Sequence, residues 1–203
     1  MRENNPILGM LSKLADLLFL NILMVLGCLP IVTIGASLTA GHFVALRIKR
    51  DEAKVFSDFW RSFKANFMQA TVVWLILVAL SAGILLLLWF YGKVSVSLSI
   101  AGIIVLLFLF MLGLWVFPLL SRFVYPTGSL IRNGFVLCFR HLFRTLGMTV
   151  GAVFPIAGLL MVYTVPVVIL FGFSIPVYIG ASLYNKVFVV MEKLIEQGQE
   201  TDS

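Results

Sequence analysis

Charged side chains are missing from long stretches of this chain of 203 residues. Only 12% of the residues are charged, Asp and Glu together number 9, and 61% are hydrophobic. A soluble domain carries about a quarter charged residues. A core of this size cannot hide so much apolar surface from water. The composition therefore excludes an ordinary soluble globular domain and predicts that lipid surrounds most of the chain.

Histidine and cysteine are also scarce. His42, His141, Cys28 and Cys138 lie far apart, without the spacing of a metal site or a disulfide framework. The sequence has no Ser–His–Asp set, no pair of carboxylates in an apolar run and no phosphate-binding glycine loop. We therefore predict that the protein is not an enzyme and holds no metal or cofactor.

Four charge-free runs indicate membrane-spanning helices, because a span needs about 20 apolar residues. These runs cover residues 17–46, 65–92, 94–121 and 145–185. The last run is too long for one span and predicts two. We expect an all-α membrane protein, a single integral membrane domain over residues 1–203. Its five transmembrane helices are expected near residues 15–34, 72–91, 98–120, 148–169 and 173–191.

Two segments between these spans, 36–67 and 131–144, are amphipathic. On a helix covering 54–67, Arg61 and Lys64 lie opposite a broad apolar face. The side chains on that face include Phe59, Trp60, Phe63, Asn66 and Phe67. Aromatic rings on one face and basic residues on the other are typical of a helix lying in the membrane interface. We predict two such interfacial helices at the cytoplasmic surface.

The two amphipathic segments resemble each other. Phe135, Phe139, Arg140 and Phe143 repeat, 76 positions later, the spacing of Phe59, Phe63, Lys64 and Phe67. Both copies follow a predicted span and lead into another, so a duplication would give a parallel internal repeat. A shared need for interfacial helices produces the same pattern, and both explanations stay open.

Basic residues are distributed unequally between the two sides of the predicted bundle. Loops 35–71 and 121–147 and the C-terminal end carry 12 Lys and Arg residues, and the other side carries 3. Short basic loops stay in the cytoplasm. We therefore expect a multi-pass membrane protein with its N-terminus outside and its C-terminus in the cytoplasm.

Two groups of residues are candidate sites. One is a surface for lipid phosphates or an acidic partner, formed by the aromatic residues above, Phe139, and the basic residues Arg47, Lys49, Arg50, Arg61, Lys64, Arg140 and Arg144. The other is an intramembrane polar site at Asp16 and Asn21, because a buried acid in a span is costly unless it is paired. Pairing of Asp16 with Lys13 at the outer interface is favoured over an ion site. Asn21 either extends a polar track or bonds a neighbouring helix.

Four sequence blocks carry a family resemblance: CLPIVTIGASLTA (28–40), RIKRDE (47–52), FWRSFKANFMQA (59–70) and NKVF (185–188). Together they resemble the YesL family, integral membrane proteins of Gram-positive bacteria built on a domain of unknown function. The resemblance implies a multi-span protein whose gene often lies beside carbohydrate ABC importers and polysaccharide-degrading enzymes. It implies no catalytic residue. At Gly41 and His42 the resemblance leads us to expect bulkier aromatic residues.

Two functions fit these observations. The first is an accessory membrane subunit linked to carbohydrate uptake, with an ABC importer permease as its partner; only the resemblance suggests the carbohydrate. The second is a small transporter or channel for an unidentified solute, with Asp16, Asn21 and the proline-containing last helices along its path. A continuous polar cavity between helices would favour transport, and a core filled with Leu and Phe would count against it.

Overall fold

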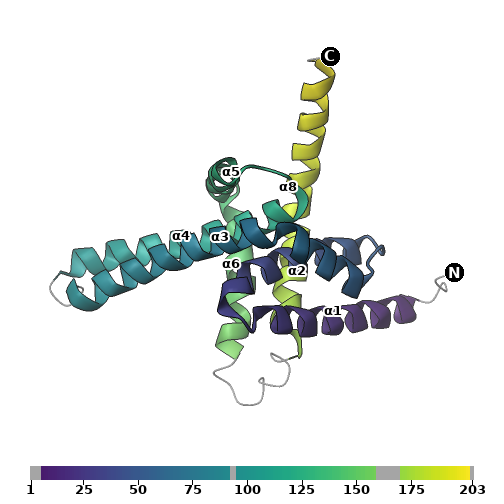
Figure 1. Cartoon of the computed structure of the whole chain (residues 1–203), viewed down its shortest axis with the longest axis horizontal. Helices are drawn as coiled ribbons and strands as arrows, with labels where there is room; N and C mark the ends of the chain where they lie inside the picture. Colours follow the sequence, from purple (N-terminus) through teal and green to yellow (C-terminus); the bar gives the residue numbers. More distant parts are fainter. Residues whose placement is uncertain (1–5, 92–94, 159–169, 202–203) are drawn as a thin grey trace.

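The computed structural model describes residues 6–91, 95–158 and 170–201, and the side chains within 8–91, 95–153 and 170–197. Every regular element in these ranges is helical, which confirms the predicted fold class. The elements, shown in Figure 1, are α1 (Pro6–Cys28), the short 3₁₀ helix η1 (Ile31–Thr33), α2 (Ile34–Lys49), α3 (Val55–Tyr91), α4 (Val96–Arg122), α5 (Thr127–Arg140), α6 (Leu142–Gly158) and α8 (Ser174–Thr201).

Helices α1 and α2 form a tight antiparallel hairpin. Pro30 disfavours the helical conformation of the residue before it, so α1 ends just ahead of it. The Thr33 hydroxyl donates to the Gly27 carbonyl oxygen at 2.7 Å, and the Ser37 hydroxyl donates to the Met24 carbonyl oxygen at 2.9 Å. These bonds use carbonyl groups near the end of α1, where the helix itself supplies few partners. The chain therefore reverses with almost no loop.

Helix α2 lies at the centre of the molecule and contacts α1, α3, α4 and α8. Most of its buried residues are small: Gly35, Ala36, Ser37, Thr39, Ala40, Gly41 and Ala45. Small residues let neighbouring helices approach closely. A Cβ atom added at Gly35 would lie 2.5 Å from the Ala70 carbonyl oxygen and 2.7 Å from the Trp74 Cβ atom. At this crossing of α2 and α3, only glycine fits.

Helix α3 has 37 residues, enough for about 55 Å. Its first half packs against α1 and α2, and its second half forms a hairpin with α4, where Gly102 lies against Leu88. The prediction of a separate interfacial helix over 54–67 is therefore wrong. These residues begin α3, and they continue into the span because no Gly or Pro occurs between Val55 and Ala82 to end the helix.

The C-terminal helices cross this arrangement. Figure 1 shows α8 running across the direction of α3 and α4, with α6 beside its first half. A buried bond from the Trp115 indole N–H to the Thr145 hydroxyl, 2.8 Å long, joins α4 to α6. An indole N–H needs such a partner when it is buried. The bond thus fixes where α6 meets α4.

Five described helices are long and apolar enough to cross a membrane: Leu8–Cys28, Ile31–Lys49, Val55–Tyr91, Val96–Arg122 and Ser174–Gln197. The expected spans 72–91 and 98–120 lie within α3 and α4, and the expected span 173–191 begins one residue before α8 and otherwise lies within it. The expected span 15–34 takes in the second half of α1 and the turn after it. Residues 159–169 of the expected span 148–169 lie outside the described residues; the start of that segment belongs to α6, a shorter apolar helix.

The remaining candidate span, η1 with α2, was not predicted as one. Residues 36–49 of this candidate span fall within segment 36–67, which the sequence pattern assigns to the membrane interface. Its small and hydroxyl-bearing side chains make it less apolar than a lipid-facing helix. It is shielded mostly by other helices, so it needs less apolar surface of its own.

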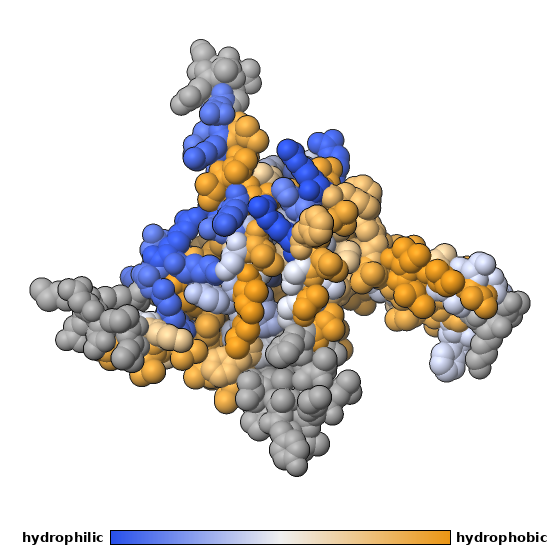
Figure 2. All heavy atoms as spheres, turned by 180° about the vertical axis from the view of Figure 1, so that it is seen from behind, coloured by the Kyte–Doolittle hydropathy of each residue, from blue (hydrophilic) through white to orange (hydrophobic). Residues whose placement is uncertain are grey.

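The surface separates polar from apolar residues. Figure 2 shows hydrophilic residues gathered over the upper and left parts of one face, with hydrophobic residues over the α3–α4 arm and the lower part. Large apolar side chains are exposed along α3 and α4, including Leu86, Trp89, Phe90 and Ile103. Exposed apolar surface of this extent fits a lipid environment.

Gly35→Ala tests the contact between α2 and α3. The added Cβ atom meets backbone, which cannot rotate away, so we expect a loss of about 1–3 kcal/mol in unfolding free energy. The matched control is Gly83→Ala in α3, where no atom lies within 4 Å and alanine improves helix propensity by about 1 kcal/mol. Thermal unfolding in detergent compares the two variants. Equal stability of the two would contradict the close approach.

Candidate functional site

Five of the predicted surface residues gather where α2 ends and α3 begins: Arg47, Lys49, Arg50, Arg61 and Lys64. We call residues 47–64 the α2–α3 junction. Asp51 adopts a left-handed conformation (φ 57°), which Asp tolerates better than most residues. The Asp51 N–H donates to the Ile48 carbonyl oxygen and the Glu52 N–H to that of Arg47, each at 3.1 Å. This is a Schellman motif, so the turn closes α2 with paired backbone groups.

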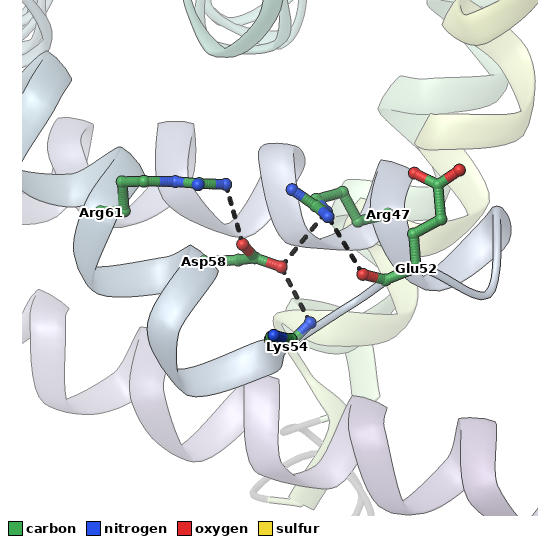
Figure 3. Close-up of polar contacts among 5 residues, drawn as sticks. All are labelled: Arg47, Glu52, Lys54, Asp58 and Arg61. Carbon is green, nitrogen blue, oxygen red and sulfur yellow. Dashed lines mark hydrogen bonds and ion pairs between the residues drawn. The ribbon is translucent and has the colours of Figure 1, made fainter.

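The buried carboxylate of Asp58 holds the junction together (Figure 3). Its Oδ2 atom accepts from the Lys54 backbone N–H at 2.8 Å and lies 3.2 Å from Arg47 Nε. Its Oδ1 atom accepts from the Arg61 guanidinium at 2.9 Å. An acid in the first turn also suits the positive end of the α3 dipole. One side chain thus joins the end of α2 to the start of α3.

Burial of Asp58 corrects the predicted helical face. The amphipathic pattern places Asp58 among the charged, outward residues, but the buried stripe is Val55, Asp58, Phe59 and Ser62. Phe59 packs under Gly27 of α1, whereas Phe56 is 57% exposed. The stripe is rotated because α1 and α2 cover this half of α3, and Arg47 offers Asp58 a partner there.

The basic residues of the junction differ in what they contact. Arg47 and Arg61 pair with Asp58, although Arg61 keeps 62% of its side chain exposed. Lys49 donates to the Ser182 hydroxyl of α8 and lies over the Tyr178 ring, 4.4 Å from its centre. Arg50, Lys54 and Lys64 are exposed, and their side chains make no hydrogen bond or ion pair with any described residue. They are therefore the charges most available to a partner.

The aromatic residues of α3 form a ladder along the helix. Phe59, Trp60 and Phe63 contact one another with ring centres 5.3–6.0 Å apart. Phe67 continues the ladder from Phe63 at 5.6 Å. Such pairs stabilise by about 1 kcal/mol each beyond burial. Asn66 donates to the Ser62 carbonyl oxygen of its own helix at 3.0 Å, so it contributes to α3 rather than to a separate site.

The second amphipathic segment is built differently from the first. Its residues end α5 and begin α6, with a break at His141 (φ −124°, ψ 46°), whereas the first copy lies within one helix. Phe139 stacks on Phe108 of α4 at 5.5 Å. Arg140 is exposed and Arg144 half-buried. Burial, with Arg144 and Arg140 nearby, lowers the pKa of His141, so its ring is neutral at neutral pH.

Asn21 and Asp16, the residues of the predicted intramembrane polar site, both lie on α1. Asn21 is buried, and its side-chain oxygen accepts from the backbone N–H groups of Phe173 at 2.9 Å and Ser174 at 3.1 Å. It therefore caps the N-terminal end of α8, as a capping residue does within its own helix. Of the two roles open for Asn21, the bond to a neighbouring helix is the one observed. Asp16 lies half-buried on α1.

Lys13 lies beside the α2–α3 junction. Its Nζ atom is 3.3 Å from Asp51 Oδ2. The predicted arrangement puts these residues on opposite sides of the membrane, and an ion pair is incompatible with that. If α2 crosses the membrane, as its length and composition allow, the chain returns to the side on which α1 begins, and the two residues share one side.

A cavity of about 620 Å³ lies between α2, the α3–α4 hairpin, α6 and the start of α8. Its lining is mainly Leu, Phe, Val and Ala, with His42 and Ser81 among the polar exceptions. His42 Nδ1 lies 3.1 Å from the Tyr184 hydroxyl, and both residues are buried. This cavity is not the continuous polar route that transport of a hydrophilic solute requires.

An ion pair that we did not predict joins α4 to α8. The Arg122 guanidinium donates to both carboxylate oxygens of Glu192, at 2.5 and 2.6 Å, and to the Asn185 side-chain oxygen at 2.8 Å. Paired donation of this kind is among the stronger polar contacts. The sequence indicates only that Arg122 and Glu192 each lie at the end of an apolar run. Residue spacing does not reveal which helix ends come together in the fold.

Metal-ligating side chains do not cluster within the described residues: no group of three His, Cys, Asp or Glu could hold an ion there. Both cysteines are free thiols, in α1 and α5. Burial raises the pKa of the Cys138 thiol, which keeps it protonated and unreactive at neutral pH.

Comparison with known proteins gives one family match. Residues 17–89 match the family described as Protein of unknown function, DUF624. The matched residues run from α1 through α2 and most of α3, and so include the α2–α3 junction. No curated protein and no solved structure matches the chain.

Asp58→Ala tests whether one carboxylate holds the junction. Removal takes the acceptor from the Lys54 N–H and the ion-pair partner from Arg47, so we expect the free energy of unfolding in detergent to fall by about 3 kcal/mol. The control Asp51→Gly removes an exposed acid and suits the left-handed conformation, so its change should stay within about 1 kcal/mol. Similar losses for both variants would contradict the role of Asp58.

Proposed function

We propose that the protein is a non-enzymatic membrane subunit whose α2–α3 junction docks an acidic partner at the cytoplasmic face. The observation that carries this proposal is a group of three exposed basic side chains, Arg50, Lys54 and Lys64, at a junction held by Asp58. Residues 47–64 contain six basic and three acidic side chains, so a positive excess remains after internal pairing. A rigid positive surface suits recognition, because little side-chain freedom is lost on binding.

The partner within this proposal is the permease of a carbohydrate ABC importer. Its support is the resemblance of the blocks at 28–40, 47–52 and 59–70 to the YesL family, which implies that gene context. We assign no catalysis, since the sequence lacks an acid–base or nucleophile set. Transport of a hydrophilic solute is not favoured, because the cavity is mainly apolar and the Asn21 oxygen is used in capping α8.

The sidedness of the junction belongs to the same proposal. If α1 to α4 cross the membrane in alternation, the start of α1, the α2–α3 junction and the end of α4 share one side, in agreement with the Lys13–Asp51 contact. Arg122 and its partner Glu192 bring the second half of α8 to that side. Most basic residues then lie together, as cytoplasmic segments do. We propose that both ends of the described chain face the cytoplasm.

Labelling of single cysteines tests this topology in a chain with Cys28 and Cys138 replaced by Ser. An impermeant maleimide should label Ser95→Cys in intact bacteria, because the α3–α4 turn faces outward. It should label Gly9→Cys and Gly128→Cys only after the cells are permeabilised; no atom lies within 4 Å of a Cβ at either position. Labelling of Gly9→Cys in intact cells would contradict the proposed orientation.

Recovery of the partner tests the docking function. The tagged protein is purified in mild detergent from bacteria grown on a polysaccharide, and co-purifying proteins are quantified by mass spectrometry. We expect stoichiometric recovery of a permease, reduced at least about tenfold by Arg50→Glu with Lys64→Glu. The charge-matched control, Arg132→Glu with Lys186→Glu, changes exposed residues outside the junction and should recover the permease normally. Recovery of the chain alone, or equal recovery by both double variants, would refute docking at the junction.

A further inference from the structure

We propose that the cavity between α2, the α3–α4 hairpin, α6 and α8 binds a neutral, lipid-soluble molecule that presents one hydrogen-bond acceptor oxygen to His42. The cavity volume of about 620 Å³ lies within the range of small-molecule sites, about 300–1,000 Å³. Such sites are lined by apolar side chains with a few polar groups that orient the ligand. This site is independent of the α2–α3 junction and of any partner bound there.

The walls of the cavity select an uncharged ligand. The α3–α4 hairpin contributes Leu77, Leu106, Leu109 and Phe110, and α8 contributes Val177. No Asp, Glu, Lys or Arg is among the described residues that line it. A charged group moved from water into such surroundings would lose its hydration and find no opposite charge. An alkyl or isoprenoid chain gains contacts there at no such cost.

The cavity is reached from the surface that faces lipid. Several residues that line it are also exposed on the outside of the protein, among them Leu85 at 56%, Phe173 at 42% and Phe110 at 39%. His42 lies at the opposite, buried end, with 7% of its surface exposed. A molecule dissolved in the bilayer therefore enters along the hairpin and brings its leading group to His42.

The pairing of His42 with Tyr184 decides which group the ligand must present. Tyr184 is fully buried, and its hydrogen bond to His42 Nδ1 is the one its hydroxyl makes among the described residues. A buried O–H group that fails to donate is costly, so Tyr184 donates and Nδ1 accepts. The ring is then the neutral tautomer with its proton on Nε2.

The Nε2–H group of His42 is a hydrogen-bond donor in the lining of this cavity. It makes no hydrogen bond to any described residue, and His42 lines the cavity. A donor left without a partner in apolar surroundings destabilises the empty site, and a carbonyl, ether or hydroxyl oxygen of a ligand relieves that cost.

Photolabelling tests the proposal with three probes of equal chain length, each with a diazirine in the chain. The probes are a hexadecanoate methyl ester, the free hexadecanoate and the corresponding alkane, added to the full chain in nanodiscs of neutral lipid. We expect saturable labelling by the ester of peptides covering residues 77–85 and 106–117, and competition by the unlabelled ester. The ester should bind about fivefold more tightly than the alkane, and the charged acid should bind much more weakly than the ester.

Two variants locate the binding site. His42→Phe should remove the preference of the ester over the alkane, about fivefold, while leaving the alkane affinity similar. Ala82→Phe fills the cavity from α3 and should abolish saturable labelling; Leu87→Phe, on the same helix but outside the cavity, should not. Equal ester and alkane affinities in the unchanged protein, or equal labelling of the Ala82 and Leu87 variants, would overturn the proposal. The comparison of ester and alkane affinities uses the unchanged protein, so it tests the proposal even if His42→Phe fails to fold.

Discussion

The close packing of α2 is the constraint on which the rest of the structure depends. In lipid, apolar helices gain little free energy by burying their apolar surface. Their association therefore relies on close packing and on polar bonds between helices. Gly35 brings the backbone of α2 against Ala70 of α3, and Gly41 leaves room for Met24 of α1. With α2 packed at the centre, the chain turns directly from α1 into α2. Helix α3 extends beyond α2 and pairs with α4.

Polar side chains inside the bundle mainly join elements that are distant in the sequence. Asn21 of α1 caps α8, Asp58 of α3 holds Arg47 of α2, and Arg122 of α4 binds Glu192 of α8. Asn21 and Asp58 are buried, so losing a partner of either costs more than it would at an aqueous surface. These polar residues are thereby committed to structure, which leaves the exposed residues Arg50, Lys54 and Lys64 and the cavity side of His42 as candidates for function.

The sequence predicts the helices better than it predicts their partners. Charge-free runs locate α3, α4 and α8, because lipid-facing helices must be apolar throughout. Helix α2 is missed as a span, since a helix shielded by other helices can use Gly, Ala, Ser and Thr. Periodicity shows that residues 54–67 are amphipathic, yet it cannot show that α1 and α2 cover them, so Asp58 is placed on the wrong face. The contacts of Arg122 and His42 span 70 and 142 positions, and no local pattern encodes them.

Accessibility of α2 in the membrane tests the account most directly. Single cysteines replace residues 36–39, four consecutive positions that together sample every side of the helix, in a chain lacking Cys28 and Cys138. The membranes are opened so that an impermeant maleimide reaches both sides. Burial of α2 among the other helices predicts that all four positions stay unlabelled until the protein is denatured, whereupon all four react. Rapid labelling of one side of the helix before denaturation would show that α2 lies at the membrane interface, and would contradict its central place in the fold.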